Sequence, residues 1–499
     1  MATWGVSVKV NPKASKEVWD GYILGIPIGS QEKFTPKKIA GLPKAMRDAV
    51  MAYAKKVEFK FKPMQWLSFD LTPTQRVVVF CWHQDRSMFE TLKMARLALE
   101  PLLRVKPKAI VLDLKSFSSV GAESLADAFV SASVVGGGAI PETKKEGSGK
   151  PSKLALEFQV GKAQEKGVAR RLGEAKALAE GTNLVRFLAM QPGNQLDPKS
   201  FKGAAKKVAT AANLGFEFIS TQKLKKLKAG AFLAVCQGSS HEDAGIVKLS
   251  YKPKKKGKHL ILVGKGITYD TGGVNLKPPR YMFGMQGDMT GAAVALALIE
   301  CASKQHWPFQ VTCYLAIADN AIGDRAYRPN DVITSLSGKT IEVVHTDAEG
   351  RMVLADTLAL ASREKYDLML NFATLTGACV GAIGTTYMGA FPNDSKYNNQ
   401  VIQAGKLSGE RAWPFPLDED FGKSLDSDVA DLKQCRLSGG VDHIEAAWFL
   451  KQFLNKEGPW VHVDLASSEH DGGLGHVGTD VTGTGVRFGF ELVRQILGS

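Results

Sequence analysis

The sequence has few cysteines and no long apolar run, and each shortage argues against a class of protein. Its six cysteines among 499 residues include no CxxC pair, so reduced thiols are the simplest interpretation and a disulfide scaffold is not expected. No run approaches about 18 consecutive apolar residues, which argues against a membrane-spanning helix. The first residues contain no apolar segment of the kind that a secretory signal needs, so we expect a cytoplasmic protein.

Several familiar catalytic motifs are also missing. The chain contains no HExxH, no GxSxG and no GxxxxGK[ST], which argues against a thermolysin-type zinc site, a serine nucleophile and a P-loop. Hydrophobic residues make up 44% and charged residues 23%, values that are typical of globular proteins. The net charge of +14 favours acidic or phosphate-bearing partners but says nothing about the fold.

The pattern of apolar runs predicts an α/β fold with two domains. The segment PETKKEGSGKPSK (141–153) lacks large apolar residues and is typical of an exposed loop. Strand-like runs at 76–82 and 109–114, and helical patterns at about 87–104 and 121–132, precede it. We therefore expect a smaller N-terminal α/β domain over 1–150, a linker over 151–170 and a larger catalytic domain over 171–499.

The larger domain begins with a helical pattern and then alternates between strands and helices. Its apolar strand runs predict a mixed, mostly parallel central sheet that is flanked by helices and buried on both faces. The helical pattern extends from 165 to about 189. The expected strands are 259–264, 310–318, 340–345, 367–373 and 460–465, and the expected helices are about 290–304, 351–364 and 442–454.

Glycines surround two charged residues after the first of these strands. Gly264, Gly266, Gly272 and Gly273 permit close backbone approach around Lys265 and Asp270, and Lys277 follows. The plainer interpretation is a tight turn with a solvated lysine and a capping aspartate. In α/β sheets, however, ligands bind beyond the carboxyl ends of the strands, and this segment follows such an end.

The segment TDAEGR (346–351) lies between an expected strand and an expected helix. If it is extended, Asp347, Glu349 and Arg351 project to one side. Neighbouring carboxylates repel each other, which raises the pKa of one of them, and a bound cation removes that cost. The alternative is an ordinary helix start, where acidic residues are favoured by the helix dipole.

Two weaker signals point to the same edge of the sheet. Asp288 lies near the start of the helix 290–304, where a simple cap is equally plausible. Backbone N–H groups of the segment 371–378 are placed to stabilise an oxyanion, although an ordinary strand-to-helix turn explains this segment too. An oxygen-rich set without cysteine suits hard or borderline divalent metals, and ions about 3.5–4 Å apart activate water for hydrolysis. We expect His345, His443 and His462 to be structural.

At these residues the chain resembles the leucyl (cytosol) aminopeptidase family of dinuclear metallo-exopeptidases. The shared motifs, whose intervals also fit, are Gly264–Ile267, Asp270–Gly273, Lys277–Pro278, Gly287–Met289, Thr346–Arg351, Ala373–Ala378 and Trp460–Ala466. The resemblance covers about 170–499, whereas the smaller domain matches only in placement and size.

The resemblance implies a set of metal ligands. Asp270, Asp347 and Glu349 would hold one divalent ion, together with the Asp347 main-chain oxygen. Lys265, Asp270, Asp288 and Glu349 would hold the other. Lys265 can be a ligand only as the neutral amine, and two nearby cations favour loss of its proton. Zinc is favoured, with manganese or magnesium exchangeable at one position.

The resemblance also implies catalytic roles. A water between the metals would attack the peptide carbonyl, and Lys277 with the Leu375 N–H would stabilise the oxyanion. Arg351 would hold a bicarbonate as general base, cradled by Ala348, Gly350 and Leu375.

The substrate's α-amino group would bind one metal and Asp288. The substrate pocket would include Met285, Thr374, Leu375 and Gly377, which favours apolar residues such as leucine. Peptides are therefore the implied substrates, and a homohexamer is the implied assembly.

Two departures and two alternatives stay open at this point. His345 replaces the family's usual asparagine, and the segment 279–283 is bulkier and more basic than usual. The lysine run 252–258 suits a nucleic-acid-binding or scaffold protein, but a solvated loop explains it better because no aromatic residues interleave it. A different dinuclear hydrolase, such as a phosphatase or amidase, would use the same carboxylates.

Overall fold

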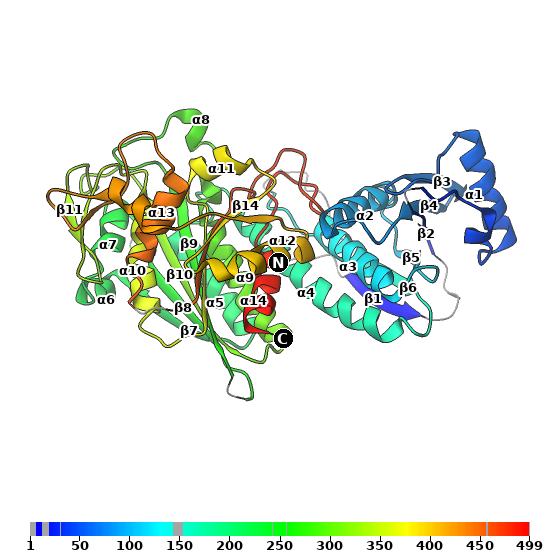
Figure 1. The fold of residues 1–499 in the computed structure, drawn as a ribbon, viewed down its shortest axis with the longest axis horizontal. Coiled ribbons are helices and arrows are strands. Elements are labelled where there is room, and N and C mark those ends of the chain that lie inside the picture. The colour runs from blue at the N-terminus through cyan, green and yellow to red at the C-terminus, as the bar shows by residue number, and fades with distance from the viewer. Residues whose placement is uncertain are drawn as a thin grey trace. The chain divides into compact units, whose positions relative to one another are not determined.

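The computed structural model describes residues 6–11, 19–29, 31–142, 153–241, 243–255, 257–455 and 458–498. The chain forms two compact units, which Figure 1 shows in ribbon form. The first unit contains Met1–Asn183 and Gly472–Thr479, and the second contains Leu184–Asp471 and Asp480–Ser499. Both units combine helices with sheets, so the predicted α/β class is confirmed. None of the described helices is both long enough and apolar enough to cross a membrane.

The smaller unit contains a six-stranded sheet in the order β1-β6-β5-β2-β4-β3, parallel except for the β3–β4 pair. Alternate residues of β4 face opposite sides: Val78 and Phe80 pack with α2 and α3, whereas Val77 and Val79 pack with α1. Both faces are therefore covered. The elements are β1 (Val6–Asn11), β2 (Gly21–Pro27), α1 (Lys44–Lys56), β3 (Trp66–Thr72), β4 (Gln75–Trp82), α2 (Met88–Leu103), β5 (Ala109–Asp113), α3 (Ser119–Gly136) and β6 (Leu154–Gln159).

The structure corrects the predicted linker at 151–170. Residues Leu154–Gln159 form strand β6 of the smaller sheet, and α4 (Glu165–Ala189) begins inside the same range. The reason is apolar burial, because Leu154, Leu156 and Phe158 are buried in the core of the smaller unit. The division between the units falls after Asn183, within α4. Most of the lysine-rich segment 141–153 lies outside the described residues.

The larger unit contains an eight-stranded mixed sheet in the order β15-β14-β17-β13-β9-β10-β8-β7. Its four central strands, β17, β13, β9 and β10, are parallel to their neighbours in that group. Three further strands form a small separate sheet, β11-β12-β16. The strands are β7 (Gly215–Ser220), β8 (Gly245–Tyr251), β9 (His259–Asp270), β10 (Gln310–Asn320), β11 (Val332–Thr334), β12 (Thr340–Glu342), β13 (Leu368–Ala373), β14 (Met388–Pro392), β15 (Ala412–Pro414), β16 (Leu432–Lys433) and β17 (Trp460–Asp464).

Helices cover both faces of the larger sheet, as predicted (Figure 1). Ile261 and Val263 of β9 pack in one core with Val353 and Leu354 of α10, whereas Gly264 lies directly against α9 on the other face. The helices are α5 (Pro198–Ala211), α6 (Thr221–Lys226), α7 (Gly230–Cys236), α8 (Pro279–Met282), α9 (Thr290–Lys304), α10 (Glu349–Ala361), α11 (Gly377–Ile383), α12 (Asn398–Ser408), α13 (Asp442–Lys451) and α14 (Val486–Leu497).

The predicted strand 340–345 is only partly correct. Thr340–Glu342 form β12, which pairs with β11 and β16 in the small sheet rather than joining the large one. The acidic segment that follows is therefore brought to the large sheet by α10. The carboxyl ends of β9, β13 and β17 lie next to one another because these strands are adjacent and parallel, and such an edge is where α/β sheets bind ligands.

Candidate active site

Lys265 lies in β9 on the face that packs against α10, and it is almost fully buried. Its ammonium nitrogen is 2.8 Å from Asp288 Oδ1 and 2.9 Å from Glu349 Oε1. It also donates a hydrogen bond of 2.9 Å to the carbonyl oxygen of Thr374. Burial alone would lower the pKa of Lys265, but the nearby carboxylates outweigh it and raise the pKa above its usual range. In this arrangement Lys265 is a charged partner of the acidic residues.

Asp270 ends β9, and backbone and side-chain donors orient its carboxylate. The Gly272 N–H and the Asn320 side-chain amide donate to Oδ1 at 2.9 and 2.8 Å. Gly272 adopts a φ of +87°, a conformation that favours glycine. The other oxygen, Oδ2, lies 2.9 Å from the Lys277 ammonium. One oxygen is thus held in place while the other faces the site.

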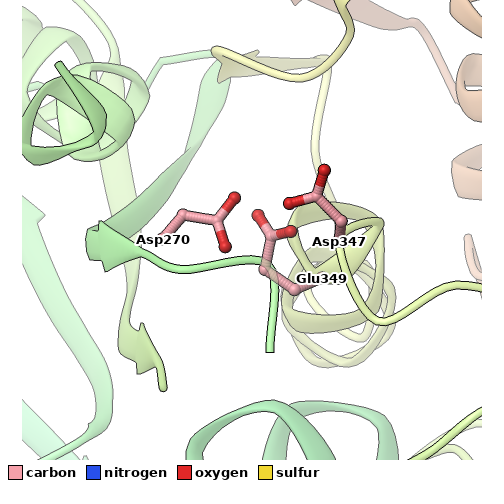
Figure 2. A group of neighbouring side chains, drawn as sticks. All are labelled: Asp270, Asp347 and Glu349. Atoms are coloured by element: carbon pink, nitrogen blue, oxygen red, sulfur yellow. The ribbon is translucent and has the colours of Figure 1, made fainter. Parts of the chain in front are cut away.

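Asp347 and Glu349 come from the loop before α10 and from the first residue of that helix. One oxygen of each, together with one from Asp270, lie within 4.8 Å of one another. Figure 2 shows the three carboxylates directed toward a common space. Lys277 also lies 2.6 Å from Asp347 Oδ1. The sequence prediction that Asp270, Asp347 and Glu349 converge is therefore met by the geometry.

The expectation that Arg351 shares one side with Asp347 and Glu349 is only partly correct. Glu349 begins α10, so Glu349 and Arg351 are two helical residues apart, which places their side chains about 200° apart around the helix rather than on one side. As a result Glu349 lines the main cavity, Arg351 lines a second cavity, and Asp347 lines both.

Asp288 reaches the site from a 3-10 helix, η2 (Met285–Met289), that leads directly into α9. It is buried, and its Oδ1 accepts a 2.7 Å hydrogen bond from the Thr374 hydroxyl in addition to its contact with Lys265. Its Oδ2 and the Oε2 of Glu349 are buried and accept no hydrogen bond from any described residue. Two carboxylate oxygens therefore remain available to a ligand.

The electrostatics of this group favour a bound cation. Burial raises the pKa of Asp288 to about 6, and burial followed by repulsion from Asp270 also raises the pKa values of Asp347 and Glu349. A divalent cation would stabilise the ionised forms and satisfy the two free oxygens. Oxygen donors without cysteine suit zinc, manganese or magnesium, so the residues present fit metal ions.

The carboxylates line a cavity of about 360 Å³. The cavity also contains every predicted substrate residue, and it adds apolar side chains from α11 and from the segment after β17. The residues that line it include Lys265, Asp270, Lys277, Met285, Asp288, Asp347, Glu349, Thr374, Leu375, Gly377, Val380, Asp464 and Ala466.

Asp464 is a site residue that the sequence analysis missed. It ends β17, is buried, and accepts hydrogen bonds from the Leu375 N–H at 3.1 Å and from the Thr376 hydroxyl at 2.8 Å. Burial raises its pKa to about 7. The sequence feature that could have identified Asp464 is its position as an acidic residue at the end of an apolar strand. In this structure the Leu375 N–H, which we expected to face an oxyanion, is already used by Asp464.

Arg351 lies beside a second cavity of about 260 Å³ that also borders Lys277, Asp347, Ala348 and Leu375. Its guanidinium lies 2.7 Å from Asp442 Oδ1 and donates to the Gln434 carbonyl oxygen at 3.1 Å. Asp442 was also missed, because an acidic residue that begins a helix is ordinarily a favourable dipole contact.

The remaining sequence signals lie outside the main cavity. The His345 ring nitrogen Nδ1 accepts a 3.3 Å hydrogen bond from the Asp347 N–H, and His462 is buried against the rings of Phe391 and Trp460. Of the bulky segment 279–283, Phe283 is 90% exposed. The described lysines of the run 252–258 lie between β8 and β9, and none is among the residues that line the cavity.

Comparison with known proteins identifies the family of this chain. The family model described as the cytosol aminopeptidase family, catalytic domain, matches residues 183–489. A probable cytosol aminopeptidase of Streptomyces coelicolor is 39% identical over 350 residues, which cover 69% of this chain and 67% of that protein.

Two solved structures extend the similarity to nearly the whole chain. The bottromycin maturation enzyme BotP in complex with Mn has a TM-score of 0.80 at 29% identity and covers 95% of this chain and 99% of its own. A substituted form of tomato leucine aminopeptidase has a TM-score of 0.86 at 26% identity and covers 100% and 97%. With its model match over more than half of its residues, the chain belongs to the cytosol aminopeptidase family and is a metal-dependent aminopeptidase.

Proposed function

We propose that the chain releases N-terminal amino acids, preferably apolar ones such as leucine, from peptides, with water as the nucleophile. The observation that supports this most directly is the convergence of Asp270, Asp288, Asp347 and Glu349 with Lys265 in one cavity. Two divalent cations held there would lower the pKa of a water molecule and polarise the peptide carbonyl.

The ligand assignment follows the geometry of the donor atoms. Asp270, Asp347 and Glu349 hold one cation, because their oxygens already lie within 4.8 Å of one another. Lys265, Asp288, Asp270 and Glu349 hold the other, which requires Lys265 to lose its proton when the metal binds. We assign zinc to these positions, with manganese or magnesium able to replace it at one of them.

The same cavity accounts for an exopeptidase and for its apolar preference. The Asp288 carboxylate lines the cavity beside the proposed cation, where it would accept a hydrogen bond from the substrate's α-amino group. In the same cavity, Met285, Val380 and Ala466 supply apolar surface for the first side chain. A methylene-scale difference in such a pocket is worth only about 1–3 kcal/mol, so the preference for leucine is moderate rather than absolute.

The Lys277 ammonium group stabilises the negative charge that develops on the carbonyl oxygen. Its ammonium is held between Asp270 and Asp347 at 2.9 and 2.6 Å, next to the place where the carbonyl must bind. A donor that is fixed before the reaction stabilises the tetrahedral oxyanion without reorganisation. The Leu375 N–H would join it only by exchanging its hydrogen bond with Asp464.

The assembly and cellular location are further parts of this proposal. Family membership supports a cytoplasmic enzyme that forms a homohexamer, and six chains of 53.9 kDa would elute as one species in light-scattering chromatography. A species of monomer or dimer mass at working concentration would contradict the hexamer without affecting the assigned chemistry.

The experiment uses purified protein loaded with zinc or manganese and offered leucine p-nitroanilide, anilides of charged amino acids, and p-nitrophenyl phosphate. Leucine release that exceeds release of charged residues is expected. Asp347→Asn should abolish it, while Asp428→Asn, which changes an exposed carboxylate of the segment before α13, should not. Phosphate release without leucine release would refute the peptidase and favour a different dinuclear hydrolase.

A further inference from the structure

The buried guanidinium of Arg351 already has an anionic partner supplied by the chain. Arg351 is 2% exposed, and its Nη2 donates to Asp442 Oδ1 at 2.7 Å. Its Nη1 donates to the Gln434 carbonyl oxygen at 3.1 Å. Charge-assisted contacts of this length are the strong class of hydrogen bond. The arginine that the family resemblance assigns to an external anion is therefore neutralised by a residue of α13.

Asp442 lies at the same cavity as the residues that surround the reaction. This second cavity, of about 260 Å³, is bordered by Lys277, Asp347, Arg351 and Asp442. The Asp442 side chain is 36% exposed, so its carboxylate is open to the cavity while it holds Arg351. Asp442 is thus placed where a small anion beside Arg351 would have to bind.

Two of the backbone N–H groups expected to cradle bicarbonate already have partners within the chain. The Ala348 N–H donates to the His345 carbonyl oxygen at 3.0 Å, and the Leu375 N–H donates to Asp464 at 3.1 Å. A Cβ at Gly350 would lie 2.6 Å from Lys265 Cε, so the Lys265 side chain already lies against Gly350. Bicarbonate beside Arg351 would meet the like charge of Asp442, and it would find the N–H groups of Ala348 and Leu375 already bonded. The residues present do not fit this ion.

We infer that Asp442 takes the place of an external anion at Arg351, so that turnover needs no bicarbonate. This inference rests on the proposed aminopeptidase function. Asp442 acts through Arg351 and is therefore a positioning residue: it fixes the guanidinium and balances its charge beside Lys277 and Asp347. Because the carboxylate is tethered, it is present at every turnover and independent of dissolved carbon dioxide.

The test compares the metal-loaded full-length protein with Asp442→Ala, Asp442→Asn and the control Asp428→Asn, in buffer depleted of carbon dioxide and then titrated with bicarbonate or acetate. We expect the wild type and the control to be unaffected by either anion. Asp442→Ala should lose about tenfold or more in kcat in depleted buffer and regain much of it, with saturation, as bicarbonate or acetate is added. Asp442→Asn should lose activity without regaining it, because the amide occupies the space without supplying the charge.

Binding of bicarbonate is measured separately by calorimetry on the same metal-loaded proteins. Binding to Asp442→Ala but not to the wild type supports the inference. Bicarbonate stimulation of the wild type, full activity of Asp442→Ala in depleted buffer, or a folded, metal-binding Asp442→Ala that neither binds nor responds to either anion would each overturn it. If the wild type releases no amino acid under any condition, the proposed function fails, whereas calorimetry still decides which protein binds the anion.

Discussion

Replacing Glu349 by glutamine separates the proposed role of this side chain as a metal ligand from its packing beside Lys265. The carboxylate is buried, with Oε1 at 2.9 Å from the Lys265 ammonium and Oε2 without a described hydrogen-bond donor. Burial and the neighbouring Asp270 hold the pKa of Glu349 well above its usual range. Glutamine has nearly the same shape as the neutral acid, so Glu349→Gln should change the metal-free protein little.

The metal-loaded protein should respond very differently. At a metal concentration about 100 times Kd, binding to the folded state stabilises it by about 2.7 kcal/mol. Outer-sphere substitutions already weaken metal sites about 10–100-fold, and Glu349 is assigned to both ions. If Kd rises about 100-fold, the same metal concentration stabilises Glu349→Gln by only about 0.4 kcal/mol.

Thermal unfolding with and without zinc or manganese measures this difference, and leucine p-nitroanilide hydrolysis measures the catalytic loss, which should be about 100-fold or more. Glu300→Gln is the matched control, because Glu300 forms an i,i+4 ion pair of 3.0 Å with Lys304 in α9 and is not one of the three carboxylates Asp270, Asp347 and Glu349. A Glu349→Gln protein with the wild-type metal-induced shift and the wild-type kcat would show that the ligand assignment is wrong.

Three other predictions test the catalytic lysine, the sheet packing and a buried carboxyl group. Lys277→Ala should lower kcat by about 100-fold while changing KM much less, because the charge that Lys277 meets exists only in the transition state; steady-state kinetics decide. Gly264→Ala should destabilise the larger unit by about 3 kcal/mol or more in urea unfolding, since the new Cβ would lie 2.4 Å from Ala292 Cα. Gly203→Ala in α5, where nothing lies within 4 Å, should be neutral or stabilising. Burial raises the pKa of Asp356 to about 7, so the folded state holds this proton more tightly than the unfolded state and stability falls as pH rises from about 4 to 7; Asp356→Asn should flatten that fall in unfolding measurements at pH 5 and pH 8.

The elements that sequence reasoning predicted well are those whose signal is local. The run 259–264 is apolar at every position but the first and the last, so a buried strand is the simplest structure that satisfies it, and β9 includes it. Asp270 was recognised as a candidate because a carboxylate at the end of such a strand needs a partner. In these cases a short stretch of sequence contains both the structural signal and the chemical one.

The features that were missed depend on contacts between distant segments. Strand β6 was taken for part of a linker because a lysine-rich stretch precedes it, and only pairing with β5 and β1 makes it a strand. The contact between Arg351 and Asp442 joins residues that are 91 positions apart, and the contact between Leu375 and Asp464 joins residues that are 89 positions apart. No local sequence pattern predicts which carboxylate will accept a hydrogen bond from which donor across such separations.

Gly350 shows how the two kinds of information combine. The family resemblance implies that this glycine is part of an anion cradle. In the structure it is the point where α10 approaches β9, and a Cβ there would lie 2.7 Å from the Lys265 ammonium nitrogen. The glycine therefore leaves room for a buried lysine between Asp288 and Glu349. The motif is constrained by packing around Lys265, and this constraint holds whether or not any external anion binds at Arg351.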